Sequence, residues 1–258
     1  MNAKAGTEVH DDSRMTLMEH LAELRKRIII SLIAIAVCTI VVFFLYHRVL
    51  HFLAAPYERV TKGDPRCATL QNPHGGCSLV VTDPLGPLLI RLRISAYGGL
   101  TLAVPFVFYQ IWRFVTPGLH RNERRYAISF LLSAVVLFAL GAVVAWFTVD
   151  KAFDFLLSIG GHTLQPFIDA NKYLTLLTLM ILAFGVAFEF PLLIMFLLLA
   201  RIVNTGQLSR SRRWMAVGIT TFAAIITPSQ DPFSLLFMAI PMYIFFEITI
   251  LLGKLLKR

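Results

Sequence analysis

The chain has 258 residues, of which 57% are apolar and only 15% are charged. A soluble domain carries about 25% charged residues, so this composition excludes a water-soluble globular protein and favours an integral membrane protein. The formal net charge is +9 at pH 7, but the basic residues flank apolar segments, which is typical of membrane orientation signals rather than of nucleic-acid binding.

The amino-terminal region is polar. Residues 1–14 are mixed in charge, and we expect them to form a mobile cytoplasmic tail. From residue 15 the pattern becomes helical, because Thr16 and Glu19 are spaced as a capping box and leucines recur at helical spacing. Residues 15–27 are therefore predicted to form an amphipathic cytoplasmic helix that runs directly into the first apolar segment.

Six apolar segments follow, and together they predict a single six-span membrane domain over residues 15–258. A helix of roughly 20 residues crosses the hydrocarbon core. The last two spans are predicted to be short, and Pro105, Pro191 and Pro241 predict kinks, so the bundle is expected to have a concave surface. The segments are residues 28–46, 94–112, 127–149, 173–200, 214–226 and 233–252.

The basic residues predict the orientation. Sixteen of the 24 Lys and Arg residues lie in the two terminal regions and the even-numbered loops, against six in the odd-numbered loops. The positive-inside rule therefore places both termini in the cytoplasm, where the basic residues are also expected to contact lipid headgroups.

The external loops are expected to form an ordered cap. Residues 47–86 are too many for a simple hairpin, and apolar side chains in this loop and in residues 150–172 favour short packed helices. Cys67 and Cys77 both lie in the first external loop, where an oxidising compartment favours a disulfide. Two free thiols remain the alternative.

Three acidic residues are candidate functional groups. Glu23 and Glu123 border the cytoplasmic ends of spans one to three, where each either pairs with a neighbouring arginine or binds a cationic ligand. Glu189 lies inside span four, roughly 16 Å from its cytoplasmic end. Such a carboxyl is costly in a membrane, and it either fixes helix packing through a hydrogen bond or provides a functional polar point.

Enzyme classes find no support in the motifs. The sequence has no His-Glu-x-x-His zinc pattern, no Gly-x-Ser-x-Gly elbow and no Walker A loop, so we expect no cofactor, no metal and no catalytic residue. A secondary transporter that uses Glu189 as a proton or ion site is the main alternative, although the absence of internal repeats counts against it. A purely structural membrane scaffold is a third interpretation.

Several separated motifs resemble one known family. They are HLAELRKR at 20–27, Ala55–Pro56, YQIWRF at 109–114, PGL at 117–119, ERR at 123–125, FG and FEFP within 184–191, Thr227–Pro228 with Asp231, and AIPMY and FE within 239–247. In this combination and order the chain resembles the TatC family, the multi-spanning receptor subunit of the twin-arginine protein translocase. One departure is Ser234–Leu235, where family members commonly carry a Ser–Gln pair.

The resemblance implies that the two surface acids bind the paired arginines of signal peptides on folded precursors. It also implies that Glu189 lies on the concave face and that Pro56 and Asp231 shape the external cap and turns. The residues implied to form the signal-peptide site are Glu23, Glu123, His20, Leu21, Arg25, Phe114, Pro117 and Leu119.

The resemblance further implies the cellular setting. The expected location is the cytoplasmic membrane of a prokaryote, and the expected energy source is the proton-motive force. The implied partners are TatB-type and TatA-type single-span proteins and further copies of the chain, with no nucleic acid.

Overall fold

The computed structural model describes residues 17–62, 77–115, 127–159, 168–199 and 202–255. These residues form nine α-helices and no β-strand, which confirms the predicted all-α class. The helices are α1 (Leu17–Phe44), α2 (Tyr46–Val60), α3 (Gly86–Val115), α4 (Ala127–Ile159), α5 (Ala170–Ala187), α6 (Phe190–Leu199), α7 (Thr205–Arg210), α8 (Arg212–Ile226) and α9 (Pro232–Leu255).

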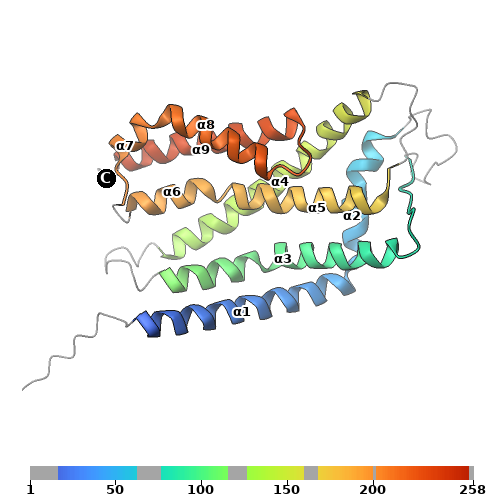
Figure 1. The fold of residues 1–258 in the computed structure, drawn as a ribbon, viewed down its shortest axis with the longest axis horizontal. Helices are drawn as coiled ribbons and strands as arrows, with labels where there is room; N and C mark the ends of the chain where they lie inside the picture. The colour runs from blue at the N-terminus through green and yellow to red at the C-terminus, as the bar shows by residue number, and fades with distance from the viewer. Residues whose placement is uncertain (1–16, 63–76, 116–126, 160–167, 200–201, 256–258) are drawn as a thin grey trace, which may run out of the picture.

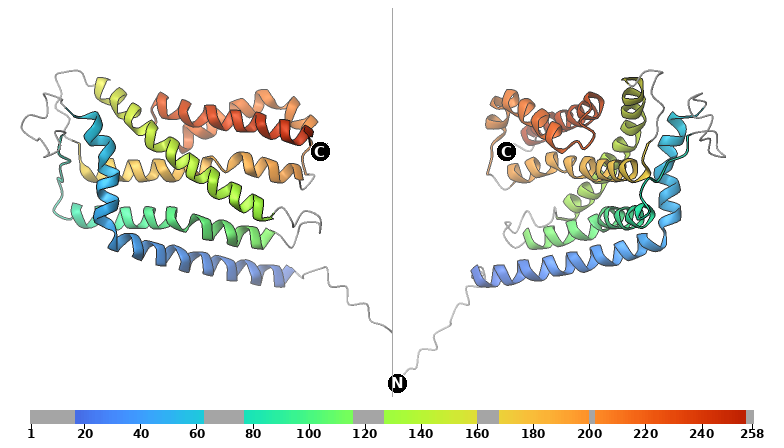
Figure 2. Two further views of the ribbon diagram at one scale, coloured as in Figure 1. Left: turned by 180° about the vertical axis from the view of Figure 1, so that it is seen from behind. Right: turned by 45° about the vertical axis from the view of Figure 1, so that its right-hand side comes forward.

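The long helices run back and forth between two ends of the molecule (Figure 1). Helices α1 and α3 lie side by side, α5 continues into α6 next to them, α4 crosses the bundle obliquely, and α8 pairs with α9 (Figures 1 and 2). The start of α1 and the end of α9 lie at one end, here called the terminal end, and α2 lies across the opposite end, here called the cap end.

Within the described ranges, five helical stretches are long and apolar enough to cross a membrane. They are Met18–Phe44, Gly86–Phe114, Ile128–Leu156, Ala170–Leu199 and Pro232–Leu255. Helix α8 has only 15 residues, a length of about 22 Å, which is shorter than the roughly 30 Å hydrocarbon core. Figure 1 shows that the turn between α8 and α9 stops short of the cap end.

The prediction of a short sixth span is wrong. Helix α9 has 24 residues and runs through Pro241 without interruption. Its length has two causes: Pro232 is well suited to a first helical position, where no backbone N–H is needed, and the apolar sequence continues to Leu255. Of the last two spans, only α8 is short.

The amino-terminal helix and the first apolar segment form one continuous helix, as predicted, because α1 extends from Leu17 to Phe44. The fourth apolar segment, in contrast, is split. Helix α5 ends at Ala187 and α6 begins at Phe190, so Glu189 lies between them. Pro191 explains the break, since proline has no backbone N–H and its ring clashes with the preceding turn.

Helix α2 forms the predicted ordered cap and is tied to the bundle by polar contacts. The Tyr173 hydroxyl donates to the Leu53 carbonyl at 3.1 Å and accepts from the Tyr57 backbone N–H at 3.2 Å. Arg59 pairs with Asp150 of α4 at 3.0 Å. The cap thus rests on α4 and α5.

Other parts of the cap differ in detail from the prediction. Pro56 is buried inside α2, and α4 continues to Ile159 so that Phe153 packs against the Tyr173 ring at 5.0 Å between centroids. An isolated parallel bridge joins Val80 to Asp169. The apolar residues after residue 149 therefore extend a membrane helix instead of forming a separate one.

Cys77 is buried, and its backbone N–H donates to the Thr61 hydroxyl at 3.0 Å. Cys67 lies outside the described residues. The disulfide between them therefore stays a prediction, while Cys38 is a buried free thiol in α1.

One part of the core joins the end of α5 to α9. Phe184 and Phe188 share this core with Met238, Met242 and Phe246, all of them fully buried, and the Phe188 ring lies 5.7 Å from that of Phe245 in α9. This contact fixes the position of the break at Glu189 relative to α9.

Candidate functional site

The candidate site lies at the terminal end, where the first turns of α1 approach the last turns of α3. One arginine connects the two helices: Arg27 Nη2 donates to Glu23 Oε1 at 2.8 Å, and Arg27 Nη1 donates to Gln110 Oε1 at 3.1 Å. The Arg27 and Glu23 side chains are 13% and 19% exposed. The site is thus a partly shielded polar cluster between two apolar helices.

One oxygen of the Glu23 carboxylate is hydrogen-bonded and the other is unpaired. Oε1 forms the ion pair with Arg27, whereas Oε2 is buried and accepts no hydrogen bond from the described residues. The two interpretations of Glu23 are therefore compatible, because local pairing with Arg27 uses one oxygen and leaves the other for a ligand.

Of the other predicted residues of α1 and α3, His20 and Phe114 lie on the side where the two helices meet. The His20 ring stacks on Phe114 of α3 at 4.4 Å between centroids, with 24° between the planes. Leu21 is 57% exposed, and Arg25 is exposed one turn further along α1. An aromatic surface thus lies beside the acid, whereas Leu21 and Arg25, each two residues from Glu23, lie on the opposite side of α1.

The remaining predicted residues, Glu123, Pro117 and Leu119, lie outside the described residues. Their place at this site stays a prediction.

Sequence analysis missed the role of Gln110 and treated Arg27 only as an alternative partner of Glu23. The spacing of four residues between Glu23 and Arg27 signals their pairing on a helix. No comparable local signal links either of them to Gln110, which is 83 positions away from Arg27.

Glu189 occupies the break between α5 and α6. Its backbone N–H donates to the Val186 carbonyl at 3.1 Å, and its carbonyl accepts from the Leu193 N–H at 3.0 Å. Its side chain is half-buried, and Oε1 has no hydrogen-bond partner among the described residues. This oxygen therefore does not fix helix packing through a hydrogen bond to that part of the chain.

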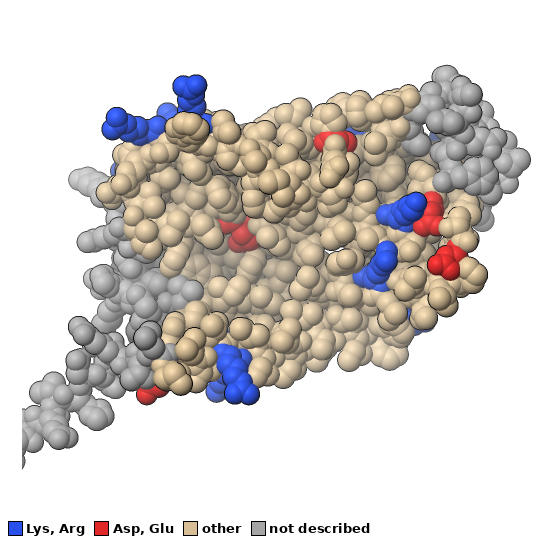
Figure 3. All heavy atoms as spheres, viewed as in Figure 1, with Lys and Arg blue, Asp and Glu red and all other residues tan. Residues whose placement is uncertain are grey.

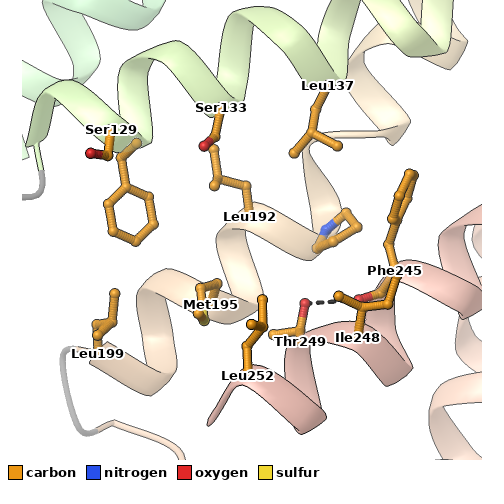
Figure 4. Close-up of a pocket in the computed structure, with 12 residues that line it drawn as sticks. Ser129, Ser133, Leu137, Leu192, Met195, Leu199, Phe245, Ile248, Thr249 and Leu252 are labelled. Atoms are coloured by element: carbon orange, nitrogen blue, oxygen red, sulfur yellow. Dashed lines mark hydrogen bonds between the residues drawn. The ribbon is translucent and has the colours of Figure 1, made fainter. Parts of the chain in front are cut away.

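A cavity of about 560 Å³ lies beside α6 toward the terminal end. Figure 4 shows Ser129, Ser133 and Leu137 projecting from α4, with side chains of α6 and α9 opposite them. The Thr249 hydroxyl donates to the Phe245 carbonyl at 2.8 Å. The cavity is largely apolar, which suits a hydrocarbon chain or an apolar side chain better than a hydrated solute.

Asp231 has a local role at the start of α9. Its Oδ1 accepts from the Ser234 backbone N–H at 2.8 Å, and its carbonyl accepts from the Leu235 N–H at 3.2 Å. Gln230 before it has a φ of +50°, a left-handed conformation that is uncommon outside glycine. Asp231 thus caps α9 and stabilises the tight turn.

The surface agrees with a membrane environment. On the face in Figure 3, Lys and Arg side chains lie toward the two ends, and the surface between them is uncharged apart from two small acidic groups. Large apolar side chains such as Trp214 and Ile225 are more than three-quarters exposed, which lipid accommodates and water does not. The fold and site therefore define a multi-pass helical membrane protein with a polar, partly shielded cluster at one end.

Comparison with known proteins identifies the family. The sequence profile of the family described as "Sec-independent protein translocase protein (TatC)" matches residues 19–241. The TatC protein of Frankia casuarinae is 41% identical over 98% of this chain and 69% of its own length, and that of Aquifex aeolicus is 36% identical over 95% and 97%.

A solved structure is also similar. The crystal structure of the twin arginine translocase receptor TatC superposes with a TM-score of 0.75 at 35% identity, and covers 93% of this chain and 100% of that one. The chain belongs to the TatC family of Sec-independent protein translocase proteins. It is a component of a protein translocase and not an enzyme.

Proposed function

We propose that this protein binds twin-arginine signal peptides of folded precursors through the cluster at the terminal end, and that this end faces the cytoplasm. The observation that carries the proposal is the open Oε2 of Glu23. A buried carboxylate oxygen that lacks a donor is costly, and a peptide guanidinium supplies a charge-assisted donor.

The neighbouring side chains suit the rest of such a peptide. The His20–Phe114 stack offers an aromatic surface to the hydrophobic stretch that follows the arginines. Glu123 is the proposed partner of the second arginine. A second acid is proposed because one carboxylate carries a single negative charge, part of which Arg27 already compensates.

The proposed membrane arrangement has six passes with both termini in the cytoplasm. Helix α8 is the fifth pass, and its length of about 22 Å requires the bilayer to thin around the α8–α9 turn. The proposed location is the cytoplasmic membrane of a prokaryote, with residues 15–258 as one membrane domain.

The proposed partners are TatA-type and TatB-type single-span proteins and further copies of this chain. Helix α8 offers an apolar outer face, on which Trp214, Val217 and Ile225 are exposed, to a neighbouring helix or to lipid. The proton-motive force is the proposed energy source.

A small-solute transporter is less well supported. The described residues contain no group of three or more His, Cys, Asp or Glu side chains placed to hold a metal ion, and Glu189 has no acidic or basic partner there with which to form a polar pathway. The transporter hypothesis therefore rests on one carboxyl group.

Site-specific photocrosslinking tests the proposal. A photoreactive residue at position 20 should crosslink to a peptide with two arginines, and much less to the same peptide with two lysines. The control position is 225, which is also exposed but lies at the α8–α9 turn. Equal crosslinking at both positions, or at position 20 with both peptides, would contradict the proposal.

A further inference from the structure

Arg27 divides its guanidinium between two acceptors. One terminal nitrogen donates to Glu23 Oε1 at 2.8 Å, and the other donates to Gln110 Oε1 at 3.1 Å. An arginine beside a carboxylate commonly forms two parallel hydrogen bonds to its two oxygens. Here Gln110, which belongs to the neighbouring helix α3, takes the second nitrogen.

This division leaves unused hydrogen-bonding capacity on both Glu23 and Arg27. Glu23 Oε2 and Arg27 Nε are both buried without a hydrogen-bond partner among the described residues. Without the Gln110 oxygen, Arg27 Nη1 has the reach to donate to Glu23 Oε2, because its sister nitrogen already lies 2.8 Å from the same carboxylate. A closed bidentate pair would then give both oxygens of Glu23 a donor, so neither would be left unpaired for a ligand.

We propose that Gln110 is a positioning residue that holds Arg27 on a single oxygen of Glu23 and thereby keeps Oε2 open for a guanidinium of the signal peptide. This inference rests on the proposed function, since it specifies how the acid of that site is kept available. Gln110 itself touches Arg27 and not the peptide.

Binding of a fluorescent signal peptide to the full chain in nanodiscs tests this inference. Gln110→Met keeps the length of the side chain and removes the oxygen, so Arg27 closes on Glu23. We expect affinity for the two-arginine peptide to fall about tenfold, the effect of losing one charge-assisted hydrogen bond. The preference over the two-lysine peptide should fall as well.

A second substitution separates positioning from packing. The double variant Arg27→Gln with Gln110→Met removes the blocking cation, and it should regain most of the lost affinity. A packing defect at position 110 would not be repaired in this way. If Gln110→Met gives no monodisperse protein, Gln110→Ala is used instead in both the single and the double variant, because it removes the same oxygen.

Asn171→Leu is the matched control. Arg93 Nη1 donates to the Asn171 side-chain oxygen at 3.1 Å, which is the same kind of contact at the other end of α3. Its loss should leave peptide affinity unchanged.

The outcomes separate the inference from the proposed function. If wild type prefers the two-arginine peptide and Gln110→Met binds equally well, the inference is wrong and the function stands. If the double variant stays as weak as Gln110→Met, Gln110 does not act through Arg27 and the inference is also wrong. If wild type shows no preference for arginine, the proposed function itself fails.

Discussion

Replacing Gly141 by alanine should force α4 and α5 apart at their closest approach. A Cβ atom at position 141 would lie 2.5 Å from the Phe184 carbonyl oxygen and 3.0 Å from the Gly185 Cα atom. Both atoms belong to the backbone of α5, so no side-chain rotation relieves the clash. Restoring an ordinary contact of 3.4 Å requires the backbones to separate by about 0.9 Å.

The cost follows from the position of this contact. Overpacking a well-packed interior costs about 1–3 kcal/mol, and alanine recovers up to about 1 kcal/mol through its better helix propensity. Since Phe184 is fully buried in the core with α9, the strain cannot dissipate toward the surface. We expect a net loss of about 1–2 kcal/mol, which lowers the melting temperature by about 2–8 °C.

Thermal unfolding of the purified protein in detergent, followed by size-exclusion chromatography, measures this loss. Gly218→Ala is the matched control, because nothing lies within 4 Å of a Cβ atom built at that position in α8, and its melting temperature should stay unchanged or rise. A Gly141→Ala protein that melts at or above the temperature of the control would refute the reasoning from the close approach.

Three further predictions concern other sites. Tyr173→Phe removes both hydrogen bonds that tie α2 to α5 and should destabilise the cap by about 1–3 kcal/mol, seen as faster amide exchange in α2; unchanged exchange would contradict it. The pKa of Asp169 is lowered from its ordinary 3.8 by the hydrogen bond from Thr82 and by the Lys172 backbone N–H. The carboxylate therefore stabilises the contact with residue 82 fully above the ordinary pKa, and this stabilisation is lost as the pH falls through the lowered pKa. Asp169→Asn should abolish this pH dependence, which amide exchange measures. Glu189→Ala should impair transport of a reporter precursor more than Glu189→Gln, because the amide keeps hydrogen-bonding capacity, whereas complete loss of peptide binding in both variants would place Glu189 at the wrong step.

The all-helical class and the break in span four could be predicted because each has a local cause. A chain in lipid must satisfy its backbone groups internally, so long apolar segments predict helices. Pro191 likewise marks the break beside Glu189 within a few residues. The length of α9 was less predictable, because Pro241 suggested an interruption that the helix accommodates.

The contact that organises the site could not be predicted, because it depends on how two distant helices pack. Helical spacing indicates that Glu23 and Arg27 meet, but it is compatible with two arrangements. Arg27 can bind both oxygens of Glu23, or it can bind one oxygen and leave the other unpaired. The packing of α1 against α3 brings Gln110 to Arg27 and decides between them. Sequence alone showed the acid, and the tertiary contact showed that one of its oxygens remains open.

A double-mutant cycle between Glu23 and the peptide arginines tests the central claim most directly. Affinities of wild type and Glu23→Gln are measured in nanodiscs for a two-arginine peptide and for its two-lysine counterpart. If Glu23 accepts a guanidinium, the lysine peptide binds wild type about tenfold to a hundredfold more weakly, and the penalty is clearly smaller in Glu23→Gln because the two changes remove the same interaction. Penalties that simply add, with no coupling between Glu23 and the arginines, would contradict the account.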